Sequence, residues 1–119
     1  MRLLAALLLA AASHAGPALA HSELRRSVPE GGAVLAEPPE RVELVFNESV
    51  QVTALRLRRA EGGAEIPLPD RRVIREARED SARLPPLGPG DYRIEWRAIS
   101  ADGHPVGGTI HFRVAPQGR

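Results

Sequence analysis

Apolar and polar residues alternate at every second position in several short stretches of this chain. Alternation of this kind places one face of a β-strand in the core and the other in solvent. The clearest examples are residues 92–98 and 110–114. The connector between them, residues 99–108, is rich in glycine and proline, which predicts a loop at one end of the sheet.

Other stretches predict further strands, whereas helical periodicity is nearly absent. The expected strands lie at residues 24–28, 42–46, 55–58, 72–77 and 81–84. The first would be an edge strand that ends at Pro29 and is followed by a turn through Gly31 and Gly32. A second turn is expected at residues 62–63. About seven short antiparallel strands predict an all-β, immunoglobulin-like sandwich.

The first twenty residues predict a secretory signal peptide. Arg2 supplies a positive charge, residues 3–12 form an unbroken apolar run, and residues 18–20 form a small-residue cleavage motif behind Pro17. Ten apolar residues are half of the roughly 20 that cross a bilayer, so a permanent membrane helix is a poor alternative. We expect cleavage after Ala20, which leaves residues 21–119 as one small domain.

Composition narrows the classes of ligand. Without the leader, fifteen arginines face fifteen acidic residues, so the formal charge is near zero and no nucleic acid partner is expected. The chain has no cysteine, which excludes disulfides and thiolate metal sites, and its single methionine is Met1. Thioether ligands for Cu(I) would therefore be lost with the leader, and nitrogen and oxygen would hold any metal.

The histidines are the candidates for metal binding. Cleavage after Ala20 would make His21 the first residue, so that its α-amine and ring Nδ1 could chelate one ion. Asp102 and His104 form a second candidate, because a sharp turn at Gly103 would let a carboxylate and an imidazole converge. Three nitrogens and one oxygen suit Cu(II), with Zn(II) and Ni(II) as competitors. Spacing alone does not show that residues 83 positions apart meet.

Several segments together resemble a known family. They are VPEGG (residues 28–32), VELVFNE (42–48), YRIEWRAISADGHPVGG (92–108) and TIHFRV (109–114). In these segments, and across essentially all of residues 21–119, the chain resembles CopC-type periplasmic copper-resistance proteins. The SADGHP segment, residues 100–105, is the most specific part of this resemblance.

The resemblance implies a Greek-key β-sandwich that holds one Cu(II) ion through an N-terminal histidine brace. His21 would give its amine and Nδ1, His104 one imidazole nitrogen and Asp102 a carboxylate oxygen. Glu48 would be an auxiliary residue at or near the metal. We expect His111, which is unusual for the family, to lie on the surface, and Trp96 to belong to the core.

The function implied is copper binding and not catalysis. A monomer in the periplasm would sequester Cu(II) or deliver it to an inner-membrane copper transporter or an oxidase-assembly protein. Two alternatives remain open, namely a small copper monooxygenase, which would use a similar brace, and a metal-free immunoglobulin-like accessory module. Small size and only four aromatic residues argue against the monooxygenase.

Overall fold

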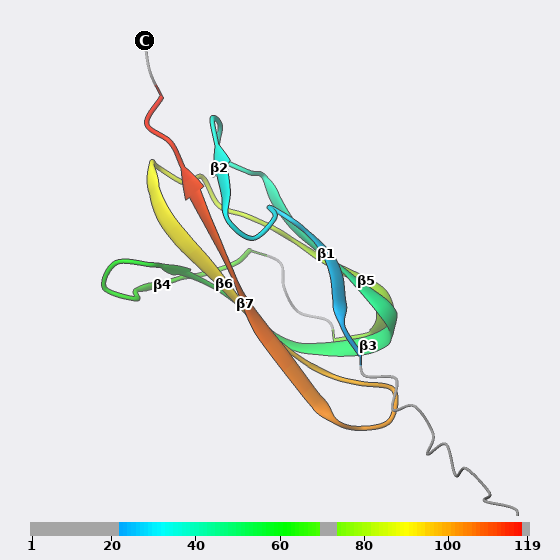
Figure 1. The fold of residues 1–119 in the computed structure, drawn as a ribbon. Helices are drawn as coiled ribbons and strands as arrows, with labels where there is room; N and C mark the ends of the chain where they lie inside the picture. The colour runs from blue at the N-terminus through cyan, green and yellow to red at the C-terminus, as the bar shows by residue number, and fades with distance from the viewer. Residues whose placement is uncertain (1–21, 70–73, 118–119) are drawn as a thin grey trace, which may run out of the picture.

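Seven strands make up the part of the chain that the computed structural model describes, residues 22–69 and 74–117 (Figure 1). In chain order they are β1 (Leu24–Val28), β2 (Ala33–Leu35), β3 (Arg41–Arg59), β4 (Glu65–Ile66), β5 (Glu76–Arg83), β6 (Gly90–Ile99) and β7 (Pro105–Val114). These residues contain no helix, and so none long and apolar enough to span a membrane. The all-β class and the number of strands predicted from the sequence are confirmed. The predicted leader and His21 lie outside the described residues.

Strand β3 pairs with four other strands, and its length corrects one prediction. Residues 42–46 and 55–58 were expected as two strands, but both belong to this single strand of 19 residues. Its first half pairs with β1 and β5, and its second half pairs with β6 and β4. Irregular pairing between Val45 and Val50 bends the strand, so one strand serves both halves of the curled sheet. The polar residues at this bend interrupt the alternation, which is why the sequence suggested a break.

Pairing along the rest of the sheet follows the order β1-β3-β6-β7-β2. The last pair corrects the expectation that all strands are antiparallel, because β2, which the sequence did not predict as a strand, runs parallel to β7. Strand β5 is continuous where two short strands were predicted, although residues 70–73 before it lie outside the description. The predicted loop 99–108 is also shorter than expected, since β7 already begins at Pro105.

The core forms where the inward residues of the two halves meet, as the alternation predicts. Its largest fully buried side chains are Tyr92, Leu44, Leu57, Ile94, Val42, Val50 and Val114. Trp96 is 6% exposed and forms a T-shaped pair with Phe46, with 5.2 Å between ring centroids. Trp96 is thus a core residue, as expected. This packing holds β6, and with it the loop that follows, in a defined position.

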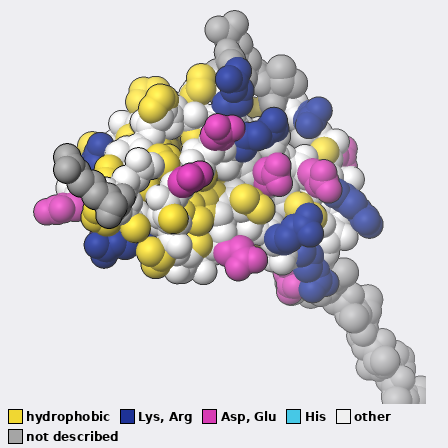
Figure 2. All heavy atoms as spheres, turned by 90° about the horizontal axis from the view of Figure 1, so that it is seen from above, with side chains coloured by type: hydrophobic (Ala, Val, Ile, Leu, Met, Phe, Trp, Pro, Cys, Tyr) yellow, Lys and Arg dark blue, Asp and Glu magenta, His cyan; other side chains and the backbone are white. Residues whose placement is uncertain are grey.

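Charged side chains of both signs share the surface that Figure 2 shows from above, with hydrophobic side chains between them. This agrees with the near-zero formal charge calculated for residues 21–119. On that face, neither sign gathers into one large patch.

Candidate metal centre

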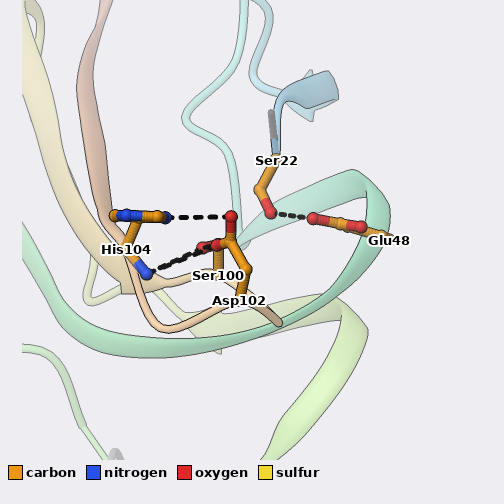
Figure 3. A network of polar contacts seen from close by, with 5 residues as sticks. All are labelled: Ser22, Glu48, Ser100, Asp102 and His104. Carbon is orange, nitrogen blue, oxygen red and sulfur yellow. Dashed lines mark hydrogen bonds and ion pairs between the residues drawn. The ribbon is translucent and has the colours of Figure 1, made fainter. Parts of the chain in front are cut away.

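The loop between β6 and β7 brings Asp102 and His104 together, as the sequence predicts. The Gly103 amide donates to the Ser100 carbonyl at 2.9 Å, and the Ser100 amide donates to the His104 carbonyl at 2.8 Å. Gly103 has a φ of +86°, a conformation that glycine adopts without steric cost. In this turn the His104 Nδ1 lies 2.9 Å from the Asp102 Oδ2 (Figure 3).

Hydrogen bonds to Ser100 fix the positions of Asp102 and His104. Ser100 is buried, its hydroxyl donates to Asp102 Oδ1, and it accepts a hydrogen bond from the His104 amide at 3.1 Å. The Ser100 hydrogen bond, followed by that of His104, lowers the pKa of the Asp102 carboxyl to about 2. Asp102 is therefore an anionic oxygen donor throughout the neutral and mildly acidic range. We did not predict this role of Ser100, although a serine two residues before an aspartate in a glycine turn is a recognisable signal.

Both candidate ligands are open to solvent. The His104 side chain is 75% exposed and that of Asp102 is 54% exposed. An ion could reach either group without any movement of the core. The position of the loop is nevertheless well defined, because it continues directly from two long paired strands.

A second set of contacts holds the start of the described chain at the same end of the molecule. The Glu23 amide donates to Asn47 Oδ1 at 2.8 Å, and the Asn47 amide donates to the Glu23 carbonyl at 3.0 Å. The Ser22 hydroxyl donates to the Glu48 carboxylate. Asn47 and Glu48 belong to the bend of β3, and Figure 3 shows Ser22 and Glu48 beside Asp102 and His104 of the loop after β6. The residue next to His21 is thus anchored near Asp102 and His104.

Only part of the predicted ligand set lies among the described residues. Asp102 and His104 meet, and Glu48 lies at the same end of the molecule, but His21 falls outside the described residues. Within residues 22–69 and 74–117, no group of three or more histidine, aspartate or glutamate side chains is placed to hold a metal. Asp102 and His104 are thus the two candidate donors that the described residues bring together in this loop.

His111 occupies a different place from these residues. It lies on β7 opposite Arg93, and its side chain is exposed, as predicted. The intervening residues of β7 separate it in sequence from the loop. It therefore offers a histidine control for experiments on the candidate metal centre.

Comparison with protein families gives a clear match. The model of the CopC domain matches residues 24–115, which include every strand described here. The chain belongs to the CopC domain family. This confirms the family that the sequence resembles.

Individual CopC relatives carry names related to copper. Copper resistance protein C of Escherichia coli is 32% identical over 106 residues, which are 82% of this chain and 83% of that protein. Copper transport protein CutJ of Bacillus subtilis is 33% identical over 98 residues, which are 80% of this chain but only 18% of CutJ.

Solved CopC structures share the fold. The crystal structure of CopC from Methylosinus trichosporium OB3b matches with a TM-score of 0.66 and 27% identity, over 83% of this chain and 98% of that chain. PcoC from Escherichia coli, described as a methionine-rich copper resistance protein, matches with a TM-score of 0.59 and 30% identity, over 80% of this chain and 99% of that one. The present CopC-family chain differs from that description, since its only methionine is Met1.

Proposed function

We propose that this protein binds one Cu(II) ion in the periplasm and sequesters or delivers it. One observation carries the proposal: in an exposed loop of a CopC-family chain, His104 Nδ1 lies 2.9 Å from Asp102 Oδ2, beside the anchored Ser22. Relatives named for copper resistance and copper transport support copper as the ligand.

The proposed ligands are the His21 amine and Nδ1, one His104 nitrogen and one Asp102 oxygen. The two donors among the described residues fit a Cu(II) ion, because Asp102 is anionic and the imidazole of His104 is accessible. The hydrogen bond between the two side chains would give way when both bind the metal directly. Nitrogen and carboxylate donors suit Cu(II), whereas a chain whose single methionine is Met1 has no thioether cluster for Cu(I).

Export is part of the proposal, because the brace requires a free amine at His21. Cleavage after Ala20 would create it, and the Ser22 and Glu23 contacts would then hold it at the correct end of the sheet. Glu48 is assigned an auxiliary role, since its carboxylate accepts the Ser22 hydrogen bond and so positions the residue after His21.

The proposed activity is binding and transfer by a monomer, with no reaction on a substrate. An inner-membrane copper transporter or an oxidase-assembly protein would be the delivery partner. The copper-loaded protein should accumulate no more peroxide with a reductant than free copper held by a simple chelator. Rapid peroxide production would instead favour a copper monooxygenase.

The decisive experiment combines intact mass with electron paramagnetic resonance on exported protein loaded with Cu(II). The mass should correspond to residues 21–119, and the spectrum should show a tetragonal Cu(II) centre with nitrogen hyperfine coupling. The His104→Ala variant should lose part of that coupling, whereas His111→Ala should leave the spectrum unchanged. A spectrum that is identical in all three proteins would contradict the proposed site, and failure to bind Cu(II) would contradict the proposed function.

A further inference from the structure

A shallow groove of about 900 Å³ runs along the outward side of β3, β6 and β7. It begins next to the candidate metal centre, because Ile99 and Pro105, which flank the loop 100–104, both line it. We call it the arginine groove after Arg56, Arg58 and Arg97, which line it together with Gly107 and Gly108. A molecule bound there would lie beside Asp102 and His104.

The charge of the arginine groove is unbalanced. Glu95 is its only acidic lining residue, and its Oε1 is shared by Arg58 at 3.1 Å and by Arg93 at 3.0 Å. Desolvation raises the pKa of the Glu95 carboxyl, but the hydrogen bonds and charges of Arg93 and Arg58 lower it overall, so this carboxyl is ionised at neutral pH. The Glu95 carboxylate therefore already pairs with two guanidinium groups.

Arg56 and Arg97 are the free cations of the groove. Both side chains are exposed, and neither forms an ion pair with any residue in the described ranges. Arg56 faces Glu95 across the pair of β3 and β6, but the Glu95 oxygen bonds to Arg58 and Arg93 instead. Arginine presents a planar fork of donors that matches carboxylates, so the two unpaired residues favour an anionic ligand.

Gly107, which lies beside the outward Arg97, leaves the wall formed by β7 low and open, while Gly108 makes room for the inward ring of Trp96. A Cβ on Gly107 would lie 2.9 Å from the Trp96 carbonyl oxygen, and one on Gly108 would lie 2.9 Å from Trp96 Nε1. Close packing against Trp96 thus requires glycine at both positions. As a consequence, no side chain covers the main chain of β7 at this point, and both residues are exposed.

The first half of β7 also has an unpaired edge. Residues 105–110 pair with β6 on one side, whereas the pairing of β2 on the other side begins only at Phe112. Among the described residues, the main-chain groups of that edge at Val106–Thr109 have no strand partner. Such an edge accepts an extended segment of another chain through main-chain hydrogen bonds.

We infer that the arginine groove docks an acidic, extended segment of the protein that exchanges copper with the neighbouring loop. This inference rests on the copper-binding function proposed above. Part of the segment would pair with the free edge of β7, and the residues that follow would cross the groove to place their carboxylates against Arg97 on β6 and Arg56 on β3. Docking there would bring the partner to the metal without covering the exposed side chains of Asp102 and His104.

The test uses exported protein and a labelled peptide of alternating glutamate and threonine, with a lysine–threonine peptide as the control. The acidic peptide should bind, and its affinity should fall with added salt because charge pairs are screened. Arg56→Gln combined with Arg97→Gln should weaken it by about tenfold or more, as expected for the loss of two charged contacts. Arg78→Gln combined with Arg83→Gln makes the same charge change on β5 and should have little effect. Hydrogen exchange should show new protection at the amides of residues 106–109.

Several results would overturn the inference. They are the absence of acidic peptide binding at low salt, equal binding by both double variants, and stronger binding to anionic phospholipid vesicles than to the peptide. Cu(II) affinity, measured on the same proteins, should be the same in both double variants and in the unmodified chain. Loss of peptide binding with normal copper affinity concerns the groove alone, whereas absence of copper binding in the unmodified chain refutes the proposed function.

Discussion

The side chain of Asn47 holds the main chain of Glu23, because the Glu23 amide donates to Asn47 Oδ1 at 2.8 Å while the Asn47 amide donates back to the Glu23 carbonyl at 3.0 Å. The pair joins the bend of β3 to the residue two positions after His21. If His21 is a copper ligand, this contact helps to determine the position of its α-amine. Asn47 is then a positioning residue for that ligand.

Replacing Asn47 with alanine should therefore weaken Cu(II) binding by several-fold. The variant loses the side-chain acceptor for the Glu23 amide, which frees the start of the chain and costs about 1 kcal/mol of folding stability. Competition with a calibrated chelator measures the affinity, and urea unfolding measures the stability. Asn47→Asp keeps an oxygen acceptor and should bind copper more tightly than the alanine variant. Equal affinities in the three proteins would show that the anchor has no part in metal binding.

An added residue ahead of His21 should abolish most of the copper affinity. The extension turns the α-amine of His21 into an amide, which is a poor metal ligand at neutral pH, while it leaves the strands intact. Chelator competition on protein with one extra alanine at that end would measure the effect. The matched control carries the extra alanine after Arg119 and should bind like the unmodified protein. Unchanged affinity in the first variant would rule out the brace.

Asp102→Asn should lower the Cu(II) affinity by about 10- to 100-fold, in the range seen when groups around a metal are altered. The amide keeps the size of the side chain but removes the negative charge that the Ser100 and His104 hydrogen bonds maintain. The same chelator competition serves as the assay. Asp91→Asn, at the far end of β6, is the control and should have no effect. An Asp102→Asn protein with full affinity would exclude this carboxylate as a ligand.

Gly108→Ala should destabilise the fold by about 1–3 kcal/mol, the usual cost of overpacking. The new methyl group would meet Trp96 Nε1 at 2.9 Å and two further ring atoms at 3.1 Å, and the ring cannot retreat easily because it packs on Phe46. Urea unfolding followed by tryptophan fluorescence would show both the loss of stability and the displaced ring. Gly31→Ala meets no atom within 4 Å and should keep the native stability and emission. If the two variants unfold alike, the contact with Trp96 is not tight.

Much of this architecture could be predicted from local patterns. The alternation at residues 92–98 reflects inward and outward side chains of β6, and the exposure of His111 follows the same rule on β7. The turn at Gly103 was predictable because one glycine lies between two potential ligands, and such a turn depends on neighbours in the sequence alone. Asp102 and His104 meet for that reason.

The length of β3 and the direction of β2 were not predictable in the same way. A bulge at residues 46–49 depends on which strands lie on either side, and the parallel pairing of β2 with β7 joins segments almost eighty residues apart. Local alternation is identical in parallel and antiparallel strands, so it carries no information about direction.

By itself, the sequence determined the all-β class, the alternation of β6 and β7, the absence of cysteine ligands and the pairing of Asp102 with His104, because each depends on composition or on residues within a few positions. Only the tertiary structure decided that Asn47 anchors Glu23 and that Arg56 and Arg97 line one groove beside the loop 100–104. These relationships join distant strands. They exist only once burial of the apolar faces has set the register of the sheet.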